Sequence, residues 1–130
     1  QRMKALGIDY GTKRVGIAVS DDTFSLAFPK IVLENSASLI RQVGELIKTE
    51  GITHIVIGES RNLKGDDNPV MERIENFSND LKQYNIPIHF EQEFFTSVEA
   101  RKIQGDTEFN DASAAALILQ RFLDKEKGKR

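Results

Sequence analysis

Apolar residues at the start of the chain alternate with small and polar ones, a pattern that predicts a β-hairpin. Residues 5–11 (ALGIDYG) form its first strand, a turn begins within GTKR, and residues 15–21 (VGIAVSD) form the second strand. A third extended segment, residues 30–35 (KIVLEN), follows Pro29. Three strands in succession with short connections predict an antiparallel meander.

Helical and extended patterns alternate in the rest of the chain. Apolar residues recur at helical spacing over residues 38–50, and Gly51 follows as a C-terminal stop. Residues 53–58 (THIVIG) are rich in β-branched residues, as expected of a strand buried on both faces of a sheet. A polar loop over 59–68 leads into a helix that begins near Pro69 and carries apolar residues as far as Leu81. The later elements are a strand over 86–93, a short helix over 96–103, a loop over 105–110 and a final helix from Asp111 to Lys125.

This order, βββαβαβαα, predicts an α/β fold with a five-stranded mixed sheet and helices on both faces, which is the ribonuclease H-like arrangement. The 130 residues match one domain, and we predict a single domain over residues 1–130. Gln1 and Arg2 precede Met3, which has the character of a natural start, so we expect them to be cloning remnants. Residues 125–130 form a basic tail that is either frayed and solvated or in contact with phosphates.

Composition narrows the class of protein. Hydrophobic residues make up 39% and charged residues 29% of the chain, and no apolar run reaches the ~20 residues of a membrane span. With no leader and no cysteine, we expect a cytoplasmic protein without disulfides or thiolate metal sites. The net charge of −2 argues against a protein that coats nucleic acid with a broad basic surface, so any such contact must be local.

An acidic residue interrupts the first predicted strand. Asp9 lies between Ile8 and Tyr10, before a turn that contains Gly11, and Gly16 follows in the next strand. Desolvating a carboxylate is costly unless it is paired or bound to a cation, so Asp9 is interpreted as a metal ligand or as the partner of a base. The alternative is an Asp that only caps the hairpin turn. The two glycines are interpreted as sites where a substrate backbone or phosphate approaches closely.

Three further acids lie at the ends of predicted elements. Glu59 follows the buried strand over 53–58, where open sheets bind ligands, although a solvated loop Glu is equally consistent with the sequence. Glu93 ends the fifth predicted strand, and Asp111 begins the final helix, where it also favours the helix as a cap. Such acids, brought to one edge with Asp9, would need divalent cations to be stable together.

The donor set selects the metal. Carboxylate oxygens without cysteine or a histidine cluster suit Mg²⁺ or Mn²⁺ and argue against zinc. His54 and His89 stand isolated in strands and are interpreted as structural, with a proton-carrying role as the alternative.

The residues resemble the YqgF/RuvX family over residues 4–124. This family is related to the RuvC resolvases and is described as Holliday junction resolvases or pre-16S rRNA nucleases. The most specific matches are GIDYGTKRVGIAVSD at the start and DASAAALILQRFL at the end, with HIVIGES and FTSVEARKI as weaker ones. The resemblance implies a ribonuclease H-like fold, an acidic site at Asp9, Glu93 and Asp111, and basic positions at Lys13 and Arg14.

Two departures from the family pattern bear on the site. Where the family commonly has Asp-Glu-Arg-Leu-Thr-Thr, this chain has Gln92, Glu93 and Phe94 and continues with Phe-Thr-Ser, so the Glu is kept but the Asp and Arg are lost. Where the family has Gly-Leu-Pro, the chain has Gly58, Glu59 and Ser. This places an acid where the related RuvC resolvases carry their second catalytic carboxylate. We therefore hypothesise that Glu59 has joined or replaced Glu93 as a metal ligand.

These features predict a metal-dependent nuclease that hydrolyses phosphodiester bonds in structured RNA or branched DNA. Asp9, Glu59, Glu93 and Asp111 would hold two cations ~3.5–4 Å apart, one activating water and the other stabilising the leaving oxygen. Candidate phosphate contacts are Lys13, Arg14, Arg61 and Lys64, of which Lys64 is equally consistent with a solvated loop charge. No aromatic-rich stripe marks the predicted sheet, so recognition by shape and backbone is favoured over base stacking.

Other classes of function fit parts of the sequence. A non-catalytic nucleic-acid-binding or ribosome-maturation factor would explain the loss of the family Asp and Arg at Gln92 and Phe94. An actin-like ATPase shares the glycine-rich hairpin but needs two such domains and a second phosphate loop, which 130 residues do not provide. We expect a monomer or a weak homodimer, without membrane association; symmetric cleavage of a junction would require the dimer.

Overall fold

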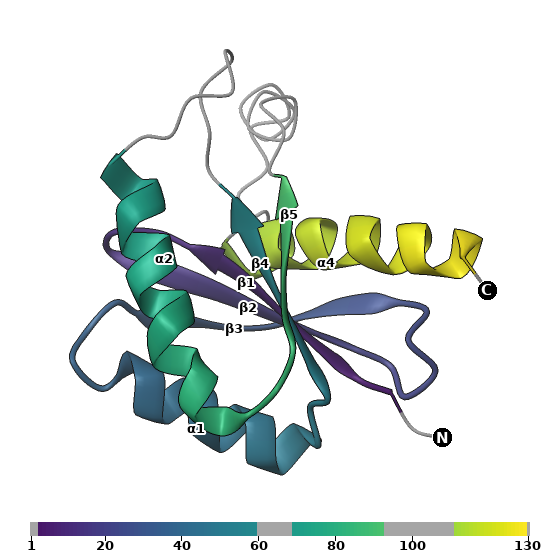
Figure 1. Ribbon diagram of the computed structural model, residues 1–130, viewed down its shortest axis with the longest axis horizontal. Coiled ribbons are helices and arrows are strands. Elements are labelled where there is room, and N and C mark those ends of the chain that lie inside the picture. Colours follow the sequence, from purple (N-terminus) through teal and green to yellow (C-terminus); the bar gives the residue numbers. More distant parts are fainter. Residues whose placement is uncertain (1–2, 60–68, 93–110, 130) are drawn as a thin grey trace.

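Five strands form one mixed sheet that is covered by helices on both faces (Figure 1). The computed structural model describes residues 3–59, 69–92 and 111–129. The strands are β1 (Ala5–Tyr10), β2 (Arg14–Ser20), β3 (Ala27–Glu34), β4 (His54–Glu59) and β5 (Ile88–Gln92). The helices are α1 (Leu39–Glu50), α2 (Pro69–Leu81), followed by a short 3-10 helix, η1 (Lys82–Tyr84), and α4 (Asp111–Gly128).

The strand order in the sheet is β3-β2-β1-β4-β5. The first three strands are antiparallel neighbours, whereas β4 runs parallel to β1 and β5 runs parallel to β4. The predicted five-stranded mixed sheet with helices on both faces is therefore confirmed. The predicted short helix over 96–103 lies outside the described residues. None of the described helices is long and apolar enough to cross a membrane.

β3 begins earlier than the sequence predicts, at Ala27, and includes Pro29. Proline cannot donate to a sheet ladder and is tolerated mainly on edge strands and at bulges. Both conditions hold here, because β3 is an edge strand and its pairing with β2 shifts: Ile17 pairs with Ile31, but Ala18 pairs with Pro29. The extra residue of this bulge is Lys30. The expected strand start after Pro29 was therefore wrong.

The two faces of the sheet bury separate apolar clusters, because side chains alternate along each strand. Leu6 and Ile8 of β1 point to the face covered by α1 and α2, whereas Ala5 belongs to the cluster under α4. In β4, Ile55 and Ile57 belong to the first cluster and Val56 to the second. This alternation decides which side chains at the strand ends face α4.

α4 packs closely on the sheet because glycines lie beneath it. A Cβ placed on Gly7 would lie 2.7 Å from Cβ of Leu119, and one on Gly58 would lie 2.7 Å from Cδ1 of Ile118. Ala115, fully buried, brings the backbone of α4 against β1. Close packing of this kind fixes the position at which α4 begins, and that position matters for the candidate site.

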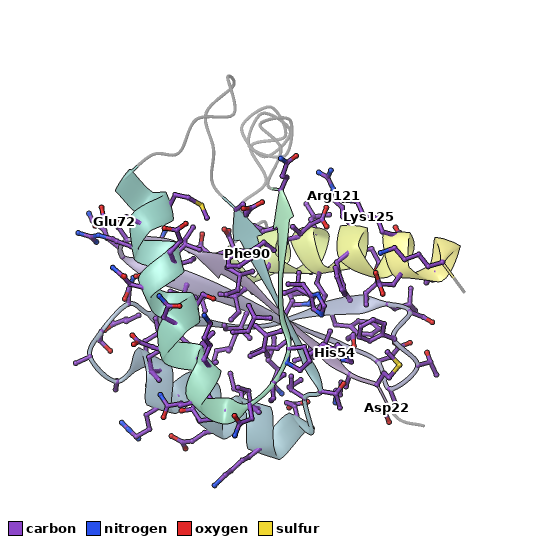
Figure 2. The ribbon with its side chains drawn as sticks, viewed as in Figure 1. Asp22, His54, Glu72, Phe90, Arg121 and Lys125 are labelled. Atoms are coloured by element: carbon purple, nitrogen blue, oxygen red, sulfur yellow. The ribbon has the colours of Figure 1, made fainter. Side chains whose placement is uncertain are left out.

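One buried carboxylate that was not recognised from the sequence ties β5 to α4. Glu91 has only 3% of its side chain exposed and accepts a hydrogen bond of 2.7 Å from Nζ of Lys125, with Nε of Arg121 at 3.8 Å. Figure 2 shows both basic side chains on α4 beside β5. Without these cations, Glu91 would be an uncompensated charge in the interior.

Replacing Lys125 by Gln should therefore lower the free energy of unfolding by about 1–3 kcal/mol, measured by urea denaturation. The expected cost is below that of breaking a fully buried pair, because Arg121 stays nearby and the Lys125 side chain is 60% exposed. Lys127→Gln is the matched control, since Lys127 pairs with the exposed Asp124 at 3.5 Å. Equal effects of the two substitutions would contradict a stabilising role for Glu91 and its cations.

Candidate active site

Asp9 and Asp111 come together at the carboxyl end of β1. Asp9 is the register partner of Gly16 on β2, and directly opposed residues of antiparallel strands have their side chains on the same face. A Cβ on Gly16 would overlap the backbone carbonyl of Asp111 and lie 2.8 Å from the backbone nitrogen of Ala112. The first turn of α4 therefore rests on Gly16, and Asp111 lies on the face to which Asp9 points. Two of the four predicted acids thus converge.

This arrangement also changes the interpretation of Gly16. The sequence suggested that Gly16 leaves room for a substrate backbone or phosphate. In the structure the room is taken by the first residue of α4. Gly16 therefore acts on the site indirectly, by letting Asp111 approach β1.

Arg14 pairs with the Asp111 carboxylate. Its Nε donates to Oδ2 of Asp111 at 2.9 Å, and its side chain is 69% exposed while that of Asp111 is 24% exposed. The pair is accessible to solvent, so its net contribution to stability is small. Arg14 therefore supplies a positive charge that lies at the acidic site and is still accessible to an anionic substrate.

The turn between β1 and β2 is held in place by the loop that precedes α1. The side-chain amide of Asn35 donates to the Gly11 carbonyl at 2.8 Å, and the backbone N–H of Asn35 donates to the Lys13 carbonyl at 2.9 Å. The exposed side chain of Lys13 lies on this turn, two residues before β2 pairs with β1. The turn and the first residue of β2 thus carry two basic residues, Lys13 and Arg14, shortly after Asp9 in the chain, and their contact with phosphate stays a prediction.

Glu59 ends β4 at the same edge of the sheet but lies on the other face. Gly58 lies under Ile118 of α4, so its neighbour Glu59 points toward α2. There it lines a cavity of about 390 Å³ together with Met71 and Phe90. The structure thus brings Asp9 and Asp111 together and does not place Glu59 beside them.

The other predicted site residues, Glu93, Arg61 and Lys64, lie outside the described residues. Within residues 3–59, 69–92 and 111–129 no three His, Cys, Asp or Glu side chains are grouped so that they could hold a metal ion. Asp9 and Asp111 nevertheless fit part of a divalent site, because two carboxylates with only oxygen donors suit Mg²⁺ or Mn²⁺.

The two histidines lie at the opposite end of the strands. His54 pairs with Ala5 at the amino end of β4, which is about 13 Å along β1 from Asp9. The His54 and His89 rings stack with centroids 5.8 Å apart, and Phe24 and Phe122 pack against them. This apolar setting favours the structural interpretation of both histidines.

Burial lowers the pKa of His54 below its ordinary value of 6.5, and the nearby His89 lowers it further, while Glu126 of α4 opposes the shift. The folded protein therefore binds fewer protons than the unfolded chain just below pH 6.5. The contribution of His54 to stability is present above pH 6.5 and is lost as the pH falls below that value. Urea denaturation between pH 7.5 and 5.5 should show this loss, with a smaller loss in His54→Gln. Equal pH dependence of the two proteins would exclude His54 as the cause.

A mixed sheet of this order, with acids at the carboxyl end of its first strand, is typical of the ribonuclease H-like nucleases. The sequence matches the family RuvX, described as Holliday junction resolvase, over residues 3–125. The chain belongs to this family, so the resemblance seen in the sequence is confirmed.

Individual relatives agree with this assignment. A protein of Maridesulfovibrio salexigens named "Putative pre-16S rRNA nuclease" is 38% identical over 93% of this chain and 98% of its own length. One with the same name from Dictyoglomus turgidum is 33% identical over 94% of each chain. The prediction of an enzyme that acts on phosphodiester bonds is therefore confirmed.

Solved structures confirm the fold. RuvC of Thermus thermophilus, solved in complex with a Holliday junction substrate, superimposes with a TM-score of 0.61 at 15% identity, covering 97% of this chain and 96% of RuvC. The Fowlpox virus resolvase, solved with Holliday junction DNA, gives a TM-score of 0.57 at 12% identity, covering 95% of this chain and 99% of the resolvase. At these identities the likeness shows a shared ribonuclease H-like fold.

Proposed function

We propose that this chain is a metal-dependent endonuclease that cuts structured nucleic acid at the carboxyl end of β1. The observation that carries the proposal is the approach of Asp111 to Asp9, which follows from the contact of α4 with Gly16. Two carboxylates on one face beside a basic turn provide both metal ligands and phosphate contacts.

Asp9 and Asp111 would hold Mg²⁺ or Mn²⁺, with Glu93 as the further ligand that the family resemblance implies. When bound, two such ions supply an activated water and stabilise the leaving oxygen. Asp9 is fixed by its position in the sheet, and Asp111 by the packing of α4, so neither ligand needs to be ordered when the metal binds. Arg14 neutralises Asp111 in the absence of metal and is positioned to contact a phosphate of the substrate.

Lys13 contributes a second phosphate contact from the same turn, and Arg61 and Lys64, which follow β4 in the sequence, stay candidates. Nucleic-acid binding through a few basic side chains at the site is consistent with the net charge of −2, because this mode of binding does not need a broad basic surface. Two substrates are consistent with the relatives: a precursor of 16S rRNA, after which the relatives are named, and a Holliday junction, the DNA bound by RuvC. Both are found in the cytoplasm of a bacterium, where we place this chain.

The proposal is tested by cleavage of a four-way DNA junction and of a 16S rRNA precursor, each with Mn²⁺ and with EDTA. Cleavage with Mn²⁺ that EDTA abolishes is the expected result. Binding of either substrate without cleavage would overturn the nuclease proposal in favour of a non-catalytic binding factor. The loss of the family's Asp and Arg, at Gln92 and Phe94, favours that class of protein.

The same cleavage assay shows which of Glu59 and Glu93 is required for catalysis. Because Glu59 points to the α2 face, we expect Glu59→Gln to retain cleavage and Glu93→Gln to lose it. If Glu59→Gln alone abolished cleavage, the hypothesis that Glu59 replaces the family's glutamate would be upheld, although Glu59 lies on the α2 face.

A further inference from the structure

A second cavity opens at the same edge of the sheet, on the face covered by α1 and α2. Its volume is about 460 Å³, within the range of small-molecule sites in proteins. Its walls come from the end of β1 and the turn after it, the loop that leads into α1, the first turn of α1, and one face of α2. All of its lining residues are among those that the structure describes.

The α2 wall carries polar side chains that have no hydrogen-bond partner among the residues that the structure describes. Arg73, Asn76, Phe77 and Asp80 line the cavity and are spaced i, i+3, i+4 and i+7, which places them on one face of the helix. Within the described part of the chain, neither the Arg73 guanidinium nor the Asn76 amide has a hydrogen-bond or ion-pair partner. Surface arginines are common, but an unpaired arginine and amide that line one polar cavity are suited to binding an anionic, hydrogen-bonding ligand.

An aromatic pair forms the floor of the cavity. Tyr10 is half-buried and lines the cavity, and its ring centroid lies 5.0 Å from that of Phe77. Phe77 is almost fully buried, so it supports the Tyr10 ring and fixes its position. A stacking surface could not be recognised from the sequence, because these two aromatic residues are 67 positions apart. A supported tyrosine ring can stack with a nucleobase of any sequence.

The ends of the cavity differ in charge. Arg73 and Asp80 are seven residues apart on α2, or roughly 10 Å along the helix. The start of α1, where Leu39 and Ile40 line the cavity, adds the positive end of a helix dipole. Asp80 disfavours a simple anion at its end, and its carboxylate can instead accept hydrogen bonds from sugar hydroxyls. A cation, a stacking ring and an acceptor within one cavity match the parts of a nucleotide.

The position of the cavity links it to the acidic site. Tyr10 directly follows Asp9 in β1, and by alternation the two side chains lie on opposite faces of the sheet at the same edge. Thr12, on the turn that carries Lys13, also lines the cavity. A strand whose phosphodiester lies at Asp9 therefore has only the β1–β2 turn to cross before it reaches the cavity.

We propose that this cavity binds one nucleotide of the substrate strand, adjacent to the phosphodiester that is cut. This inference rests on the proposed function, because it takes the strand to be held at Asp9 and Asp111. Arg73 contacts the phosphate, Tyr10 stacks with the base, and Asn76 donates to or accepts from the base edge. The ligand class is a nucleotide within a strand of RNA or DNA that has been unpaired next to the cut.

Binding is measured by fluorescence anisotropy with a labelled RNA hairpin that carries a single-stranded 3′ extension. The Asp9→Asn protein is used so that no cleavage occurs. Adding Arg73→Gln should raise the Kd about tenfold, because a hydrogen bond to a charged group is lost. The matched control adds Arg41→Gln, which removes the same charge from α1 outside the cavity, where Arg41 pairs with Glu45 at 3.3 Å. That control should change the Kd less than about twofold, which is the loss of affinity expected when one exposed positive charge outside the cavity is removed.

A second measurement locates the ligand without reference to cleavage. Titration with adenosine 5′-monophosphate, followed by NMR, should shift the amide signals of Thr12 and Asn76, and Arg73→Gln should abolish these shifts. Equal effects of Arg73→Gln and Arg41→Gln on hairpin binding would overturn the inference. Mononucleotide binding that leaves hairpin affinity independent of Arg73 would also overturn it, in favour of a free-nucleotide site.

The outcomes separate this inference from the proposed function. If the unmodified protein fails to cut either substrate while Arg73→Gln still weakens hairpin binding selectively, the nuclease proposal fails and the nucleotide site stands. If the protein cuts and Arg73→Gln leaves both the KM and the hairpin Kd unchanged, the nuclease proposal stands and the nucleotide site fails.

Discussion

Replacing Asp9 by Asn should lower Mn²⁺-dependent cleavage by about a thousandfold or more. Asn has the size of Asp but not its charge, so the substitution weakens metal binding at the end of β1 while leaving the strand intact. A catalytic metal contributes several kcal/mol of charge stabilisation in the transition state, and each 1.36 kcal/mol corresponds to a tenfold change in rate. The loss is measured as kcat/KM on the four-way junction and on the rRNA precursor.

Asp124→Asn is the matched control for this loss. Asp124 lies on α4, as Asp111 does, but about 20 Å further along the helix, where it accepts a hydrogen bond from Gln120 at 3.0 Å. We expect this variant to cut at the rate of the unmodified protein, while Asp111→Asn shares the defect of Asp9→Asn. If Asp9→Asn and Asp124→Asn cut at equal rates, Asp9 has no role in catalysis.

Replacing Gly16 by Ala should have the second large effect, because it separates the two acids. The added Cβ would overlap the carbonyl of Asp111, and a backbone group in the first turn of α4 cannot move aside as a side chain can. Overpacking of this kind costs about 1–3 kcal/mol, and we expect the upper end of that range. Cleavage should fall as well, even at temperatures where the variant is folded, because Asp111 is displaced from Asp9.

Gly58→Ala provides the comparison. Its Cβ would meet Cδ1 of Ile118 at 2.7 Å, the end of a flexible side chain that can adopt another rotamer. Urea denaturation should therefore show a smaller loss of stability for Gly58→Ala than for Gly16→Ala, with cleavage largely retained. A Gly16→Ala protein as stable and as active as the unmodified chain would show that α4 does not depend on this contact.

The sequence predicts the order of elements well because each element carries its own local signal. The apolar spacing of α1 ends at Gly51, which adopts the left-handed conformation expected of a C-cap (φ 68°). The β-branched run of β4 indicates a strand buried on both faces, and both faces are covered. By contrast, β3 begins before Pro29, because an edge strand with a bulge tolerates proline where a central strand would not.

Features that depend on distant contacts could not be predicted in the same way. Phe24 lies in the loop between β2 and β3, with a positive φ of 61°, yet it is 98% buried because it packs against Phe122 of α4, whose ring centroid is 6.0 Å away. Glu91 looks like a solvent-facing strand residue until α4 supplies its cations. Both contacts join segments that are far apart in sequence, so no local pattern shows them.

In the candidate site, too, some features have a local sequence signal and others depend on contacts between distant segments. Asp9 and the basic turn could be located from the sequence, because an acid inside an apolar strand is unusual there. The approach of Asp111 depends on how α4 lies across the sheet, which only the fold determines. The sequence places Glu59 at the carboxyl edge of the sheet, where β4 ends. Neighbouring residues of a strand point to opposite faces, however, and Gly58 is the residue that faces α4, so Glu59 faces α2.

If Asp9 and Asp111 hold a divalent cation together, crystals soaked in Mn²⁺ should show it when diffraction is recorded at the manganese absorption edge. We predict an anomalous difference peak about 2–2.3 Å from oxygens of both carboxylates, which is lost in Asp9→Asn crystals soaked in the same way. A peak elsewhere in the molecule, or an Asp9→Asn protein that binds Mn²⁺ at the same place, would show that the two carboxylates do not form the metal site.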